Sequence, residues 1–129
     1  MNTLESAIKE AYESQGQTKA INKVHLEFLK GNYMIPIEKN SSDTEPQVLY
    51  LSDNGNNFLP VFNEQSHLDK WAEEIKDNID TLYLTGVDLL KGLEANVFVC
   101  LNLGSEHYKE FHPSELSKLK NIVAKFFND

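Results

Sequence analysis

Apolar residues divide the chain into helical and extended segments. They recur every three or four positions in the first 30 residues, which predicts two short helices, and again in three later segments that start near Asn63, at Thr85 and at Pro113. Alternating or continuous apolar runs predict strands instead. These runs read NYMIPI, VLYLS, NFLPVF, TLYLT and NVFVCLN, and the resulting order of elements is ααβββαβαβα.

Local signals place several element boundaries. The Asp-Asn-Gly sequence between VLYLS and NFLPVF tolerates a positive φ, which predicts a hairpin from about 48 to 62. Thr85 begins a segment with the spacing of a capping box, and Asn63 is expected to cap the helix that follows it. On that helix we expect Trp71 to be largely buried. Pro60, in the strand before it, indicates an edge or bulged position.

The middle strands are linked by a hairpin, so a purely doubly wound sheet is excluded. The expected fold class is α+β, of the mixed α/β sandwich kind, with a mixed sheet that contains a hairpin and is packed by helices. No linker or internal repeat divides the sequence, and we expect one domain over residues 1–129. The polar, turn-forming stretch EKNSSDTEPQ, residues 38–47, is expected to be a mobile loop within it.

The charge of the chain restricts its partners. The net charge is -8, and all 12 basic residues are lysines. Phosphate recognition uses basic patches and the guanidinium fork of arginine, so we expect no nucleic-acid partner. We also expect no membrane partner, because clustered positive charge is missing and the longest apolar run is far below the roughly 20 residues that span a bilayer. Glu5, Glu10 and Glu13 are expected to form a solvated face of the first helix.

The single cysteine and the first residues both favour a reducing cytoplasm. Cys100 has no second cysteine with which to form an internal disulfide, and the first 15 residues lack the basic segment and apolar core of a secretory signal. Cys100 lies in the apolar run VFVCL, where burial raises the pKa of the thiol and opposes a role as nucleophile. Ser105 lacks the flanking glycines of a nucleophile elbow. We therefore expect no catalytic residues.

Four histidines raise the question of a metal site. His107 and His112 are five positions apart, whereas two ligands on one helix are usually four apart, and neither a cysteine pair nor an HExxH motif accompanies them. His25 and His67 lie on predicted helices that are distant in sequence. We expect no metal site and no cofactor.

The NLGS turn, residues 102–105, follows the predicted central strand. Ligands often bind where such a strand ends in an open α/β sheet. A phosphate loop is disfavoured, because this turn has one glycine and is followed by Glu106 instead of a basic residue. Asn102, Gly104 and Ser105, with Asp88 nearby, are the candidate contacts for a ligand or partner. The alternative is a tight turn in which Gly104 adopts a backbone conformation that other residues avoid.

Four motifs follow one another along the chain: FLPVFNEQSHLDKW, TGVDLLKGL, VFVCLNLGS and FHPSELSKL. Their order, with the earlier FLKGNYMIPI, resembles the SseB protein N-terminal domain family over about residues 24–122. Asn63 stands where the family tends to have threonine, and Leu103 replaces the proline of the family's turn. The positions that match the first three motifs are Pro60, Val61, Phe62, Leu68, Trp71, Gly86, Asp88, Leu89, Leu90, Asn102, Gly104 and Ser105.

The resemblance implies a bacterial cytoplasmic protein from a family without established catalytic residues. Because no catalytic constellation is visible either, we expect a non-catalytic protein-binding or adaptor module that is not an enzyme and has an unknown protein partner. One alternative is a small-molecule-binding protein or enzyme with its site at the turn from Asn102 to Ser105. Another alternative is an effector or immunity-type protein, which the small acidic domain also fits.

Overall fold

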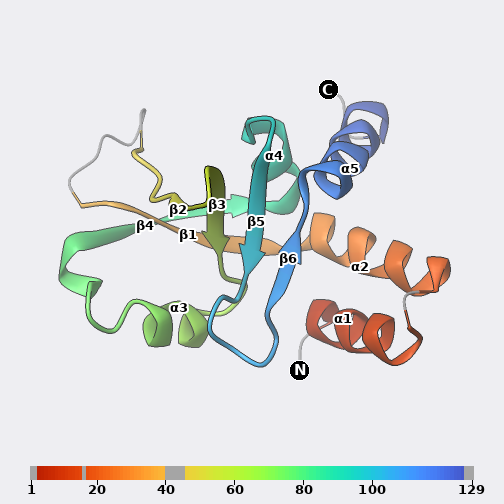
Figure 1. Ribbon diagram of the computed structural model, residues 1–129, viewed down its shortest axis with the longest axis horizontal. Coiled ribbons are helices and arrows are strands. Elements are labelled where there is room, and N and C mark those ends of the chain that lie inside the picture. Colours follow the sequence, from red (N-terminus) through yellow and green to blue (C-terminus); the bar gives the residue numbers. More distant parts are fainter. Residues whose placement is uncertain (1–2, 16, 40–45, 127–129) are drawn as a thin grey trace.

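A computed structural model describes residues 3–15, 17–39 and 46–126 and has the expected α+β fold (Figure 1). The helices are α1 (Thr3–Glu13), α2 (Thr18–Lys30), α3 (Gln65–Trp71), α4 (Gly86–Gly92) and α5 (Pro113–Phe126). The strands are β1 (Asn32–Glu38), β2 (Leu51–Asp53), β3 (Asn56–Val61), β4 (Ile79–Thr85), β5 (Val97–Leu101) and β6 (Lys109–Phe111). The predicted order is confirmed. The structure adds β6 and a 3-10 helix, η1 (Lys76–Asn78), each too short to show a periodic pattern.

The strands form two sheets that cross each other (Figure 1). The larger sheet has the order β2-β3-β5-β6, with β3 and β5 parallel and the outer pairs antiparallel, so the predicted mixed sheet is confirmed. The smaller sheet is the antiparallel pair β1-β4. An isolated bridge between Met34 and Phe62 joins the two sheets.

The predicted hairpin is the pair β2-β3. Asn54 and Gly55 form its turn with φ values of 51° and 81°, the left-handed conformation that a two-residue hairpin turn requires. Although β3 lies inside the larger sheet, its last residue paired with β2 is Phe58. Pro60 comes after Phe58, so β2 no longer pairs with β3 at this position, while β5 still pairs on the other side. The edge position predicted for Pro60 is therefore present on the β2 side of β3 alone.

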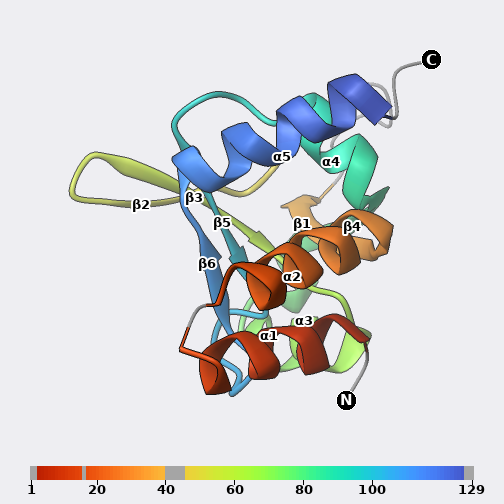
Figure 2. The same ribbon diagram turned by 90° about the vertical axis from the view of Figure 1, so that its right-hand side faces the viewer.

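The main core lies between the strands and helices α1, α2, α4 and α5. In Figure 2, α1 and α2 lie side by side with α5 above them. The ring of Phe28, on α2, packs against Phe111 and Tyr33 with centroid separations of 4.6 and 4.8 Å. The Tyr33 hydroxyl donates to the Phe28 carbonyl at 2.6 Å, and burial raises the pKa of Tyr33. The Tyr33 hydroxyl, the polar side-chain atom among these three rings, therefore has a hydrogen-bond partner inside the core.

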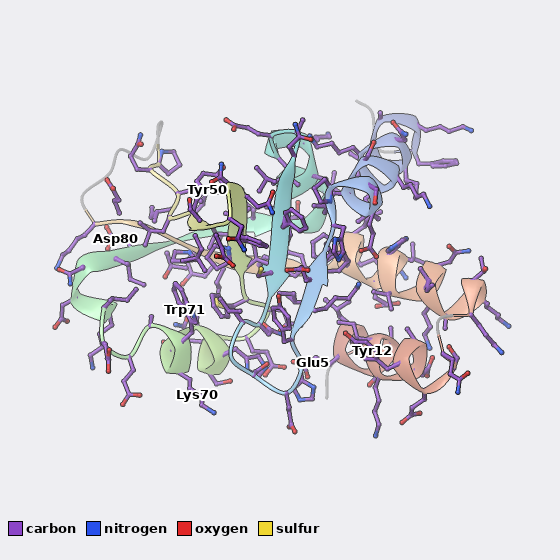
Figure 3. All side chains as sticks on the ribbon, viewed as in Figure 1. Glu5, Tyr12, Tyr50, Lys70, Trp71 and Asp80 are labelled. Atoms are coloured by element: carbon purple, nitrogen blue, oxygen red, sulfur yellow. The ribbon has the colours of Figure 1, made fainter. Side chains whose placement is uncertain are left out.

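A second, smaller core lies beneath α3 and contains Phe62, Leu68 and Ala72. Trp71 points from α3 toward β1 and β4 (Figure 3), with its ring 5.5 Å from that of Phe62. Trp71 was expected to be largely buried, and it is partly buried against this core, less completely than Phe62 and Leu68. α3 ends at Trp71, and the following residues turn toward η1 and leave Ile75 37% exposed.

Most of the predicted loop, residues 40–45, lies outside the described residues. Its ends are structured: Glu38 belongs to β1, and its backbone N–H donates to the carbonyl of Gln47 at 2.8 Å. α2 begins at Thr18, and Gln17 occupies its N-cap position without a side-chain capping hydrogen bond. No helix in the described part of the chain is long and apolar enough to cross a membrane.

An ionic contact links α2, β6 and α5. His25 Nε2 lies 2.8 Å from Glu115 Oε2, and Lys109 Nζ lies 3.5 Å from the same oxygen. Burial alone would raise the pKa of Glu115, but the hydrogen bond to His25 and the charge of Lys109 outweigh it and lower the pKa. A carboxyl with a lowered pKa in the folded state stabilises the fold above its unfolded-state pKa, and this stabilisation is lost as pH falls through the folded-state value.

We therefore expect Glu115→Gln to lower the free energy of unfolding by about 1 to 2 kcal/mol at pH 7 and to flatten its decline in acid. Urea unfolding measured from pH 7 downward would show the wild-type and variant curves converging as Glu115 becomes protonated. Glu73→Gln is the control, because Glu73 is exposed. A constant offset between Glu115→Gln and wild type at all pH values would contradict the role of the charge.

Candidate functional site

Asn102 fastens the ends of two strands together. It is fully buried, and it follows β5 with a φ of 55°. Its side-chain oxygen accepts from the backbone N–H of Asn63 at 3.2 Å, and its side-chain nitrogen donates to the Asn63 side-chain oxygen at 2.9 Å. Its own backbone N–H donates to the Val61 carbonyl at 2.8 Å. We call Asn63 and Asn102 the asparagine pair. Its polar atoms are occupied within the protein, so Asn102 is a structural residue.

This geometry corrects the role predicted for Asn63. The residue that precedes α3 is Glu64, and it makes no side-chain capping hydrogen bond. Asn63 lies one position earlier, and its side chain is bonded to Asn102. Sequence patterns favour asparagine as a cap, but here a contact 39 residues away takes the same side chain.

The rest of the NLGS turn is stabilised by hydrogen bonds within residues 102–107. Gly104 is exposed and has a φ of 86°, so the tight-turn alternative is confirmed for this residue. The Ser105 backbone N–H donates to the Asn102 carbonyl at 3.1 Å. The Ser105 hydroxyl accepts from the backbone N–H of His107 at 3.0 Å. No ring nitrogen of a histidine is bonded to that hydroxyl in the described residues, so nothing there activates it as a nucleophile.

The structure does not bring Asp88 to this turn. Asp88 is an exposed residue of α4, and its backbone N–H donates to the Thr85 hydroxyl at 3.1 Å, which confirms the predicted cap. α4 lies at the end of β5 opposite to the NLGS turn (Figure 1). Asn102, Gly104 and Ser105 are therefore neighbours, whereas the fourth candidate belongs to the other end of the sheet.

A cluster of histidine and glutamate side chains lies next to the turn. Glu5 is 3% exposed, and its Oε1 lies 3.0 Å from His67 Nε2. Its other carboxylate oxygen lies 3.9 Å from His107 Nε2. Figure 3 shows Glu5 between α1 and the loop that joins β5 to β6. The expected solvated face of α1 is thus wrong for Glu5, which lies among the buried residues Leu4 and Ile8.

Two further carboxylates border this cluster. Glu64 Oε2 lies 4.0 Å from His67 Nε2, and Glu106 Oε1 lies 3.4 Å from His107 Nε2. An open cleft of about 430 Å³ adjoins the side of the cluster formed by Glu5, Glu106 and His107. The cleft is lined by Glu5, Ile8, Lys9, Tyr12, Glu13, Glu106 and His107.

Sequence reasoning missed the cluster because its members come from α1, α3 and the β5-β6 loop. No spacing rule relates residues 5, 64, 67 and 107. One signal was present: Glu5 is an acidic residue within an apolar stripe, three positions before Ile8. A charged side chain at a core position usually has a partner.

A third feature is the outer edge of β4. Among the described residues, β4 is paired only with β1. In that register Met34 lies opposite Tyr83. Met34 exchanges both of its backbone hydrogen bonds with Phe62, at 2.8 and 3.0 Å, so its N–H and carbonyl face away from β4. Residues opposite each other in an antiparallel pair either exchange both bonds or neither. The backbone N–H and carbonyl of Tyr83 therefore face the outer edge.

The same argument applies two residues earlier. Pro36 lies opposite Thr81, has no N–H, and uses its carbonyl to accept from Leu49 at 3.1 Å. Thr81 thus also directs its backbone groups outward. The Tyr83 side chain is 67% exposed on this strand. Together these residues form an edge that another extended segment could pair with.

Comparison with known proteins gives a family but no individual relative. The family model of the SseB protein N-terminal domain matches residues 4–118 of the 129. No curated protein and no solved structure shows significant similarity to the chain. The match contains the asparagine pair, all members of the histidine and glutamate cluster, and the whole of β4.

Proposed function

The chain belongs to the SseB protein N-terminal domain family, and from this premise we propose that it is a non-catalytic protein-binding or adaptor module of the bacterial cytoplasm. Its binding surface is the outer edge of β4, which takes an extended segment of a partner protein as an added strand. The observation that carries the proposal is the direction of the backbone groups of Thr81 and Tyr83, which the register of β1 turns outward.

Exposed strand edges are usually protected, because they pair readily with other chains. β4 is seven residues long and carries neither a proline nor a lysine, two common protective residues. Tyr83 adds an aromatic side chain beside these outward backbone groups, and tyrosine is enriched among the residues that dominate binding energy. Backbone pairing supplies affinity, and Tyr83 supplies a contact for one partner side chain.

The charge around the edge indicates the chemistry of the partner segment. Exposed acidic residues flank β4, with Asp77 and Asp80 at its start and Asp88 after its end. The chain as a whole carries a net charge of -8. A segment with lysine or arginine beside its paired residues is attracted to this edge, whereas a second copy of the acidic chain is repelled.

The thiol and hydroxyl candidates support a role without catalysis. Burial raises the pKa of the Cys100 thiol, and the hydrogen bond from the Tyr108 hydroxyl, 3.7 Å from the sulfur, only partly offsets this effect. The thiol is thus a poor nucleophile. A buried, reduced cysteine is also compatible with the proposed cytoplasmic location.

We expect Tyr83→Ala to weaken partner binding about tenfold or more, because it removes the aromatic contact. Thr81→Pro should abolish binding, because it removes an outward N–H without removing a bond to β1. The measurement has two steps. Peptides are selected from a displayed random library on the wild-type protein, and their dissociation constants for each variant are then measured by fluorescence polarisation.

Tyr12→Ala is the matched control, since Tyr12 is also 67% exposed but lies on α1. Selected peptides should keep their affinity for this variant and should be rich in lysine or arginine. Peptides that bind Thr81→Pro and Tyr83→Ala as tightly as wild type would place the binding surface elsewhere. Failure of the wild-type protein to select any peptide would reject binding of extended segments.

A further inference from the structure

We propose that Glu5, Glu64 and His67 bind one divalent transition-metal ion of the zinc class, with His107 as the neighbouring fourth donor. This site is separate from the edge of β4 and does not depend on the function proposed for it. Its residues come from α1, the N-cap of α3, α3 itself and the β5-β6 loop.

The positions of the donor atoms fit a metal ion. One ligand atom from each of Glu5, Glu64 and His67 lies within 4.8 Å of the other two. His67 Nε2 is 3.0 Å from the nearer oxygen of Glu5 and 4.0 Å from that of Glu64. Ligands bound tetrahedrally to zinc at about 2.0 Å are roughly 3.3 Å apart, which lies between these two values. Because the largest separation among the three donors is at most 4.8 Å, binding requires the side chains to close by up to about 1.5 Å.

His107 adds a second imidazole beside this set of three donors, outside the group whose ligand atoms all lie within 4.8 Å of one another. Its Nε2 lies 3.9 Å from the second oxygen of Glu5, and its ring centroid is 5.9 Å from that of His67. Imidazole nitrogen favours zinc and its neighbours in the periodic table, whereas calcium and magnesium prefer oxygen ligands throughout. The donor set therefore selects against calcium and magnesium.

Glu5 is buried beside a hydrogen-bond partner that a metal ion can replace. A carboxylate with the 3% exposure of Glu5 is buried at low cost only beside hydrogen-bond donors or a cation, and His67 Nε2, 3.0 Å away, is such a partner in the absence of an ion. The cleft lined by Glu5 and His107 reaches the cluster from solvent, so an ion has a path of entry. Glu64 approaches from the more exposed side, with 43% of its side chain accessible.

The test uses the full-length protein, treated with a chelator and then desalted. Zinc is titrated into the protein in competition with a chromophoric chelator, and cobalt(II) is titrated separately, because its visible spectrum reports nitrogen and oxygen ligands. We expect one zinc ion per chain. Glu64→Gln should weaken zinc binding about tenfold or more, and His67→Gln should weaken it about a hundredfold or more.

His112→Gln is the control, because His112 is 60% exposed and outside the cluster. It should bind zinc with wild-type affinity. Glu64→Gln also separates loss of zinc binding from loss of folding, because the half-exposed Glu64 side chain can be replaced without disturbing the core. The melting temperature of this variant without metal should equal that of wild type. No saturable zinc binding by the wild-type protein would overturn the proposal. Equal zinc affinity of wild type, Glu64→Gln and His67→Gln would overturn it as well.

Discussion

Replacing Asn102 with alanine is expected to lower the free energy of unfolding by about 3 kcal/mol. Two losses add up. The part-buried N–H and side-chain oxygen of Asn63 lose their partner, which costs about 1 to 3 kcal/mol. Alanine at a φ of 55° is also strained, by about 1 to 2 kcal/mol. Urea unfolding, followed by the fluorescence of the single tryptophan, Trp71, measures the change.

Asn102→Gly separates the two losses. Glycine adopts a positive φ without strain but supplies no amide, so it should recover about 1 kcal/mol of the loss. Asn63→Ala combined with Asn102→Ala should cost clearly less than the sum of the single changes, because both remove the same hydrogen bonds. Additive effects, or a loss below about 0.5 kcal/mol for Asn102→Ala, would show that the asparagine pair does not hold the strand ends.

Gly86→Ala is expected to lower the free energy of unfolding by about 3 kcal/mol or more, because the added carbon has no space. A Cβ at Gly86 would lie 2.3 Å from the carbonyl oxygen of Phe28 and 2.9 Å from the Cα of Leu29. Both are backbone atoms at the end of α2, so they cannot move aside as a side chain would. The Gly86 N–H also donates to the Gly31 carbonyl at 2.9 Å, and displacement of α4 would break that bond.

Gly92→Ala is the matched control within the same helix. No atom lies within 4 Å of a Cβ placed there. Because alanine favours helix more than glycine does, by up to about 1 kcal/mol, this variant should be as stable as wild type or slightly more so. Thermal unfolding of both variants gives the comparison. Equal melting temperatures for Gly86→Ala and Gly92→Ala would mean that the ends of α2 and α4 are not rigidly packed.

The elements that sequence predicted well are those determined by local patterns. The hairpin follows from Asn54 and Gly55, and the start of α4 follows from Thr85, because the residues that form each feature are adjacent in the chain. The end of α3 is not visible in the sequence, since Ile75 continues the helical spacing of apolar residues although α3 ends at Trp71 and the chain turns into η1 before β4. Periodicity alone contains no information about such a turn.

The candidate site was predicted less well for the same reason. The sequence singled out Asn102 as a candidate contact for a ligand or partner, but its bond to Asn63 could not be foreseen, because the two residues follow different strands, β5 and β3. Glu5 was assigned to solvent, although the fold encloses it beside two histidines. The edge of β4 was not foreseen either, since the outward direction of Tyr83 depends on how Met34 bonds to Phe62. Each of these features is a tertiary contact between distant segments.

The parallel pairing of β3 with β5 also bears on how the chain folds. Asn57 pairs with Val97, so the ladder closes a loop of about 40 residues that contains α3, β4 and α4. Closing such a loop costs conformational entropy before the stabilising contacts form, so nonlocal strand pairs form slowly. The local hairpin β2-β3 can form before it pairs with β5. We expect Asn102 to bond to Asn63 only after this slow step, so the asparagine pair should chiefly slow unfolding of the native state and have little effect on the folding rate.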